Sequence, residues 1–146
     1  MIVLLYHFLY CVLATGFFAL MMSAPKKSVP FSALCAGIGY VIYEYLFLFY
    51  GQELWGYFVG TLFIALSGEA LARILKMPSI MFIFPAIIPL VPGLGIYRTM
   101  LTLVENRPQD FMAEGSKTLF IAGAMALAIA ITSLLARKFK KRPKKG

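Results

Sequence analysis

Four ionisable residues lie inside long apolar stretches of this sequence: Glu44, Glu69, Arg73 and Arg98. Ionisable side chains inside a membrane are costly, and they usually pair with one another or face a solute pathway. Glu44 and Arg98 could form an ion pair that is also a substrate or proton site. Glu69 and Arg73 have the i, i+4 spacing of a local ion pair on one helix. The four residues therefore predict binding of charge or exchange of protons.

Prolines and glycines interrupt the apolar stretch that carries Arg98, most densely in residues 89–95, which read PLVPGLG. A proline inside a helix removes a hydrogen bond and clashes with the preceding turn, at about 3 kcal/mol. We predict two half-helices joined by an unwound segment over residues 89–95, near the bilayer midplane. The second half-helix would begin around Gly95 or Ile96, and its free N–H groups would attract a carboxylate. The alternative is a proline-kinked helix that binds nothing.

The predicted substrate-binding residues surround this break. They are Pro89, Pro92, Gly93, Gly95, Tyr97 and Arg98. We expect the Arg98 guanidinium, one turn beyond the glycines, to bind a carboxylate. Glu44 or Glu69 would serve as the proton-responsive carboxylate, and the sequence does not distinguish between them. Arg73 is the ion-pair candidate beside Glu69.

Other kinds of chemistry have too few residues. One histidine, His7, and two cysteines, Cys11 and Cys35, cannot supply the roughly four close ligands of a structural metal site. No catalytic triad, phosphate-binding loop or clustered carboxylate pair is present. We therefore predict no enzyme activity, no metal and no cofactor, and we assign His7 only a polar position at the membrane interface.

The composition predicts the elements that hold these residues. Of the 146 residues, 61% are hydrophobic and 14% are charged, and the mean hydropathy is +0.84. A bilayer core about 30 Å thick needs roughly 20 apolar residues in a helix. Five stretches meet that length: residues 2–22, 29–50, 54–75, 79–104 and 118–136. The fold class predicted is all-α, an integral membrane bundle of five transmembrane helices, with the fourth broken.

The positive charges indicate the orientation of this bundle. Seven of the 14 basic residues lie in the last ten positions, and Lys26, Lys27, Arg73 and Lys76 follow the first and third stretches. By the positive-inside rule the N-terminus is outside and the C-terminus is cytoplasmic. We therefore expect a five-helix domain over residues 1–136 and a basic cytoplasmic tail over residues 137–146. The tail follows a hydrophobic segment and holds a single aromatic residue, so we expect it to contact anionic lipid and no nucleic acid.

Small residues predict where helices approach closely. Gly56 and Gly60 have GxxxG spacing in the third stretch, and Ala122, Ala126 and Ala130 share one face of the fifth. In lipid such residues allow the close backbone contact that drives helix association. Packing within this chain and packing against a second subunit both remain open for these faces.

One run of the sequence resembles a known transporter family. Residues 60–100, GTLFIALSGEALARILKMPSIMFIFPAIIPLVPGLGIYRTM, are similar to the core of the threonine/serine exporter family, specifically its small five-helix component. A weaker likeness, VPFSALCAGIGYVIY, extends back to residue 29. The first and fifth stretches match only in length and position.

The resemblance implies a membrane subunit of a two-component secondary exporter in the bacterial inner membrane. Its substrates would be threonine and serine, or small dicarboxylates, and transport would be driven by the proton gradient. The partner would be a larger five-helix subunit with a cytoplasmic N-terminal region, to which this chain would be the inverted counterpart. The competing hypothesis is a non-transporting structural or assembly subunit.

Overall fold

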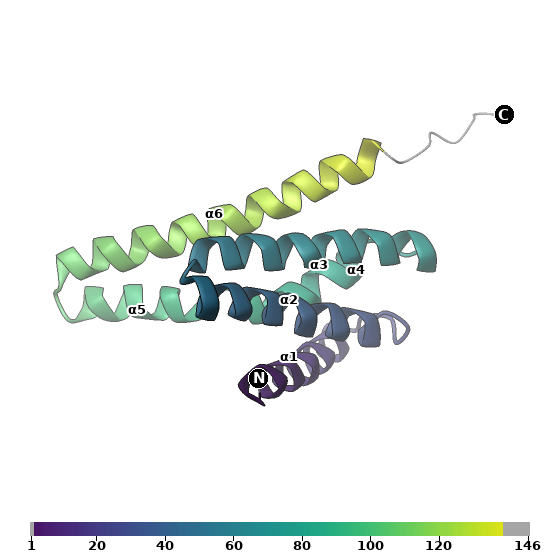
Figure 1. The fold of residues 1–146 in the computed structure, drawn as a ribbon, viewed down its shortest axis with the longest axis horizontal. Coiled ribbons are helices and arrows are strands. Elements are labelled where there is room, and N and C mark those ends of the chain that lie inside the picture. The colour runs from purple at the N-terminus through teal and green to yellow at the C-terminus, as the bar shows by residue number, and fades with distance from the viewer. Residues whose placement is uncertain (1, 139–146) are drawn as a thin grey trace.

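The computed structural model describes residues 2–138, and that part of the chain is helical without strands (Figure 1). The elements are α1 (Ile2–Met21), α2 (Val29–Tyr50), α3 (Glu53–Leu75), α4 (Ile80–Ile87), the 3₁₀ turn η1 (Ile88–Leu90), α5 (Gly93–Val104) and α6 (Pro108–Lys138). The predicted all-α class is confirmed. Four helices, α1, α2, α3 and α6, are long and apolar enough to cross a membrane, and α4 to α5 forms a fifth candidate span, bent by 49°. The predicted tail beyond residue 138 lies outside the described residues.

Tight turns connect the first helices into neighbouring antiparallel pairs. Gly51 ends α2 in a left-handed conformation (φ 63°), and its N–H donates to the carbonyl of Phe47 at 3.0 Å. Glycine suits this position because it has no Cβ to clash. Lys76 closes α3 in a similar left-handed conformation (φ 52°). These two turns place α3 against α2 and α4, and α2 also packs against α1.

The contact between α2 and α3 uses the predicted GxxxG pair. A Cβ atom on Gly60 would lie 2.7 Å from the carbonyl oxygen of Gly39, and one on Gly56 would lie 2.9 Å from that of Tyr43. Only glycine permits this backbone approach, so this face packs within the chain. The alanines at 122, 126 and 130 are instead exposed on α6, and nothing lies within 4 Å of the position a Cβ would take on Gly123.

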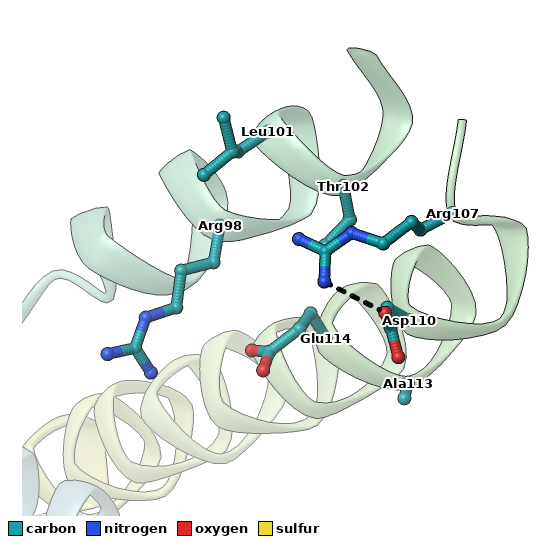
Figure 2. Close-up of a pocket in the computed structure, with 7 residues that line it drawn as sticks. All are labelled: Arg98, Leu101, Thr102, Arg107, Asp110, Ala113 and Glu114. Atoms are coloured by element: carbon teal, nitrogen blue, oxygen red, sulfur yellow. Dashed lines mark hydrogen bonds and ion pairs between the residues drawn. The ribbon is translucent and has the colours of Figure 1, made fainter. Parts of the chain in front are cut away.

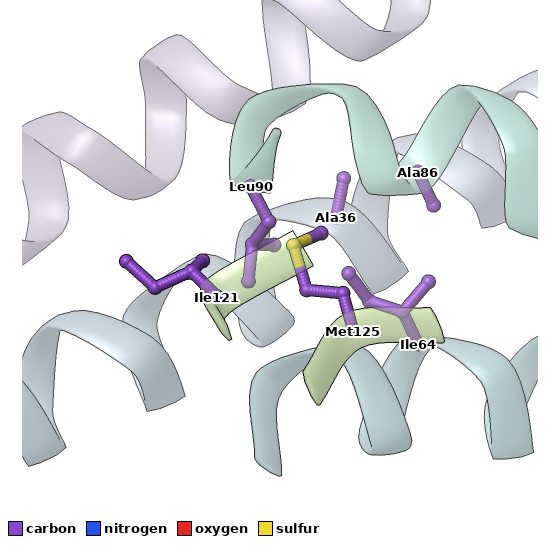
Figure 3. Packing of buried hydrophobic residues seen from close by; sticks show 6 residues of the cluster. All are labelled: Ala36, Ile64, Ala86, Leu90, Ile121 and Met125. Carbon is purple, nitrogen blue, oxygen red and sulfur yellow. The ribbon is translucent and has the colours of Figure 1, made fainter. Parts of the chain in front are cut away.

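The buried core surrounds the 3₁₀ turn. It comprises Ala36, Ile64, Ala86, Leu90, Ile121 and Met125 (Figure 3). These side chains come from α2, α3, α4, η1 and α6, and Leu90 is the last residue of the 3₁₀ turn. The end of the first half-helix is therefore anchored by packing from three other elements, α2, α3 and α6.

The break in the fourth segment is confirmed, but it is shorter than predicted. Only Val91 and Pro92 are non-helical, and α5 begins at Gly93 rather than at Gly95 or Ile96. Val91 is extended (ψ 129°), as expected before a proline. Pro89 and Pro92 occupy the starts of η1 and α5, where the missing N–H removes no helical hydrogen bond. The chain therefore accommodates these prolines with little unwinding.

The position of the break along the bundle follows from its contacts with α3. Ile83 packs on Gly68 and Leu90 packs on Gly60, so the break lies beside the half of α3 that begins at Glu53. Beyond it, α5 packs against α6 alone among the described elements. Figure 1 shows α5 and the start of α6 extending past the turn between α2 and α3. The sixth helix accordingly begins at Pro108 and not at residue 118.

Candidate functional site

A cavity of about 300 Å³ lies beside the break, where α2, α3, α5 and α6 meet. Three residues of the predicted substrate site line it: Pro92, Gly95 and Arg98. The other charged residues in its wall are Glu53, Glu114 and Lys117. The structure thus adds three charged side chains that the sequence placed in connections outside the spans.

An adjoining cavity of about 340 Å³ continues between α5 and α6 toward their connecting turn. Arg98 and Glu114 line both cavities. Figure 2 shows the side chains of Arg98 and Arg107 extending toward α6 on either side of Glu114. Arg107 is already occupied, because it donates to Asp110 at 3.2 Å and pairs with Glu105.

The charged groups of the first cavity fall into one engaged pair and two available groups. Lys117 Nζ lies 2.6 Å from a carboxylate oxygen of Glu53, which ties α6 to the start of α3. Arg98 and Glu114 make no side-chain hydrogen bond or ion pair with any group in residues 2–138. One guanidinium and one carboxylate therefore remain available to a solute.

Gly95 determines how closely α5 approaches α6. A Cβ on Gly95 would lie 2.5 Å from Oγ1 of Thr118. The hydroxyls nearby are used by the backbone, since Thr99 donates to the carbonyl of Gly95 and Thr118 to that of Glu114, both at 2.8 Å. Close packing at Gly95 keeps Arg98 on the side of α5 that faces the cavity.

The remaining predicted binding residues lie outside this cavity. Pro89 is partly buried in η1, whereas Gly93 and Tyr97 are exposed, with 61% of Tyr97 accessible. The structure therefore brings together half of the six predicted residues.

Glu44 is buried, but it does not meet Arg98. The Nδ1–H of His7 donates to Oε1 of Glu44 at 2.5 Å, which joins α1 to α2. The interface role given to His7 missed this contact. The sequence does contain a signal for a packed polar face, because His7, Cys11 and Thr15 recur every four residues on one face of α1.

Glu69 and Arg73 lie near the opposite end of the bundle from Glu53. They line a cavity of about 520 Å³ between the end of α3, the start of α4 and the end of α6. Arg73 donates to the carbonyl of Ala136 at 2.8 Å, and within residues 2–138 it forms no ion pair with Glu69. The predicted local bridge is therefore replaced by a contact between α3 and α6.

Metal binding has no visible basis in this part of the chain. Among residues 2–138, no three histidine, cysteine or acidic side chains lie close enough to hold a metal ion.

The chain matches the family model described as "Threonine/Serine exporter, ThrE" over residues 7–135. An uncharacterized protein of Haemophilus influenzae is 29% identical over 144 residues, covering 92% of this chain and 48% of that protein. A threonine/serine exporter of Corynebacterium glutamicum is 26% identical over 127 residues, covering 87% of this chain and 26% of that protein. The chain thus spans about half of one relative and about a quarter of the other. No solved structure matches it significantly.

The family match covers the broken segment, the cavity residues and most of the flanking helices. The match confirms the resemblance seen in residues 60–100. The apolar helices are long enough to cross a membrane, as expected for a transporter. The chain is therefore a multi-pass protein of the bacterial plasma membrane and belongs to the threonine/serine exporter family.

Proposed function

We propose that this chain is the membrane subunit of a two-component secondary exporter for amino acids of the threonine and serine type. The observation that supports this most directly is the cavity at the break, in which Arg98 and Glu114 have no partner among residues 2–138. A free amino acid carries one carboxylate and one ammonium group. The two available side chains match those two groups.

The Arg98 guanidinium is the proposed carboxylate ligand. Its planar fork of donors fits a carboxylate in a bidentate manner. The first-turn N–H groups of Leu94 and Gly95, which line the same cavity, lack intrahelical acceptors and point toward the break. Glu114 would hold the ammonium group of the substrate. In this arrangement Pro89, Pro92 and Gly93 maintain the break, and Tyr97 makes no contact with substrate.

The charge balance of the cavity favours an amino acid over a dicarboxylate. Its wall holds two cations, Arg98 and Lys117, and two carboxylates, Glu53 and Glu114. A zwitterion leaves this balance unchanged. A dicarboxylate adds two negative charges to a site that already contains two carboxylates, and unpaired charge in such surroundings is costly. Small dicarboxylates are therefore the second substrate class, expected to be transported less well.

A larger five-helix subunit would cover the side of α5 that this chain leaves open. Apolar side chains of α5 are largely exposed, including Leu94 (62%), Met100 (57%) and Val104 (78%). Only α6 packs against α5 within residues 2–138. The relatives contain about two to four times the aligned length, so comparable proteins have further chain to cover such a face.

Proton coupling would use one of the buried or partly buried carboxylates, Glu44 or Glu69. With the N-terminus outside and the C-terminus cytoplasmic, this chain would be the inverted counterpart of a partner that starts inside and crosses five times. The cavity beside the break would then lie toward the outer surface, and the cavity lined by Glu69 and Arg73 toward the cytoplasm.

Fusion of a reporter to Gly146 should show a cytoplasmic C-terminus. The basic residues after α6 favour the cytoplasmic side. An alkaline phosphatase fusion, which is active only outside, should be inactive, whereas a green fluorescent protein fusion should fluoresce. The opposite pattern removes the inverted-counterpart arrangement.

Deleting this chain from its host should lower efflux of labelled threonine and serine, and complementation should restore it. The assay follows a panel of amino acids and diacids after preloading the cells, and it expects larger losses for the hydroxy amino acids than for diacids. Unchanged efflux of the whole panel overturns the exporter function. Transport lost on deletion but restored by a chain changed at both Arg98 and Glu44 favours the structural-subunit hypothesis.

A further inference from the structure

Glu44 and His7 form a buried polar pair on the face of α2 that meets α1. Glu44 is 7% exposed, and its Oε1 accepts the hydrogen bond from His7 at 2.5 Å. Its other oxygen, Oε2, is buried and has no hydrogen-bond partner within residues 2–138. An unsatisfied buried oxygen carries a desolvation penalty and marks a site that needs an explanation.

No permanent cation among residues 2–138 faces this carboxylate. From α1 the titratable neighbours are His7 and Cys11, and from α2 the neighbour is Tyr40, whose ring lies edge-on to His7 at 6.0 Å. The packed elements α4 and η1 contain no titratable side chain.

The titratable groups of α3 are engaged elsewhere. Tyr57 packs on Tyr43, with 4.3 Å between ring centroids, and Glu53 pairs with Lys117. Glu69 and Arg73 lie toward the other end of that helix and line a different cavity. In the described part of the chain, His7 is therefore the one side chain placed to compensate the charge of Glu44, and histidine is the side chain whose charge changes between pH 5 and 8.

We propose that His7 and Glu44 together form the proton-binding site that couples transport to the proton gradient, an inference that rests on the proposed exporter function. With one proton, the pair is a neutral imidazole donating to a carboxylate, with a net charge of −1. A second proton from water binds at Nε2 of His7 and gives an imidazolium and a carboxylate, with no net charge. His7 is the accessible member, since its side chain is 40% exposed and that of Glu44 is 10%. The proton leaves by the reverse step, and no other bond breaks.

A row of aromatic rings connects this pair to the substrate cavity. Tyr40 contacts His7, and its ring centroid lies 5.5 Å from that of Tyr43. Tyr43 packs on Tyr57, and both line the cavity beside the break. A change of charge in the pair alters the packing of α1 on α2, and the rings of α2 carry that change to the cavity wall. Among residues 2–138, no such row of paired rings includes a neighbour of Glu69.

His7 is the single histidine of the chain, so its imidazole can be followed without assignment. The experiment uses protein purified without a histidine tag, labelled in the imidazole and placed in lipid bilayers, and records the imidazole NMR signals against pH. Glu44→Gln should move the midpoint of the imidazole signals to lower pH, because the amide does not stabilise an imidazolium as the carboxylate does. The matched control Glu105→Gln, in the turn between α5 and α6, should leave it unchanged. An unchanged midpoint in Glu44→Gln overturns the pair as a proton site.

Coupling is tested separately, in everted membrane vesicles from the host carrying each variant. Glu44→Gln and His7→Gln should lower threonine accumulation driven by an acidic lumen by about tenfold or more. Both should retain counterflow of threonine without a gradient, which also shows that they are folded. Normal gradient-driven accumulation in both variants, or loss in Glu69→Gln instead, overturns the inference. If the unmodified chain moves no threonine or serine, the proposed function fails, and the NMR result still decides the pair.

Discussion

Replacing Arg98 with glutamine should abolish export of threonine and serine while leaving the chain inserted in the membrane. Arg98 makes no side-chain hydrogen bond or ion pair within residues 2–138, so its loss removes no contact that holds the described helices together. Glutamine keeps a hydrogen-bonding amide but loses the charge and the bidentate fork. Losing one partner of a hydrogen-bonded charge pair costs at least about 2 kcal/mol, or about 30-fold in apparent affinity. Efflux of labelled substrate at several internal concentrations measures this change.

The matched control for this prediction is Arg107→Gln. It removes the same charge a few residues away, but Arg107 pairs with Glu105 and Asp110 in the turn after α5. Efflux should therefore stay near that of the unmodified chain. Membrane content of both variants is compared by immunoblot. Unchanged efflux with Arg98→Gln refutes the role of this residue in substrate binding.

The balance of charge in the cavity gives Arg98→Gln a second readout, which is the loss of transport compared between amino acids and diacids. If a carboxylate of the substrate meets Arg98, amino acids and diacids should both lose transport in Arg98→Gln. Glu114 should matter only for substrates with an ammonium group. Its neighbours Glu53 and Lys117 already satisfy one another at 2.6 Å, so they leave Glu114 as the free carboxylate of the wall.

The break in the fourth segment could be predicted because proline and glycine act locally. Three prolines within eight residues, at 85, 89 and 92, strongly disfavour one continuous helix, and the chain indeed bends between Leu90 and Gly93. The extent of unwinding could not be predicted in the same way. Pro89 and Pro92 fall at the starts of helical turns, where proline is tolerated, and only the folded backbone reveals that register.

The partners of the charged residues depend on contacts between helices, which sequence spacing does not contain. Sequence spacing predicts a pair between Glu44 and Arg98, because each lies at a similar distance from the end of its stretch. In the fold, Glu44 faces α1 and meets His7, whereas Arg98 lies on α5, beyond the turn that joins α2 to α3. The side of a helix that each residue faces, and the neighbour it finds there, follow from tertiary packing.

The start of α6 shows the limit of hydropathy for locating a helix. Residues 108–117 contain three charged side chains, and their hydropathy predicts a connection. They nevertheless form the first turns of α6, which pack against α5 and contribute Glu114 and Lys117 to the cavity. A hydrophobic stretch marks where a helix crosses lipid, but a helix can continue past the lipid when another helix packs beside it.

Replacing Gly60 with alanine should destabilise the bundle, although alanine is the better helix former. The new Cβ would lie 2.7 Å from the carbonyl oxygen of Gly39 and 3.1 Å from Cδ2 of Leu90. A backbone oxygen cannot rotate away, so α2 and α3 must separate, at a cost of about 1 to 3 kcal/mol for such overpacking. The thermal unfolding temperature in detergent, followed by size-exclusion chromatography, should fall. Threonine efflux should fall as well, because Leu90 anchors the break.

Gly123→Ala makes the same substitution on α6 and should instead raise the stability of the bundle. Nothing lies within 4 Å of the Cβ position at Gly123, so alanine introduces no clash. The helical preference of alanine over glycine should then raise stability by about 0.5 to 1 kcal/mol. Because the two variants share their chemistry, their difference isolates the contact between α2 and α3. Equal unfolding temperatures for Gly60→Ala and the unmodified chain would contradict the close approach of Gly60 to Gly39, on which the position of Leu90 and the break depends.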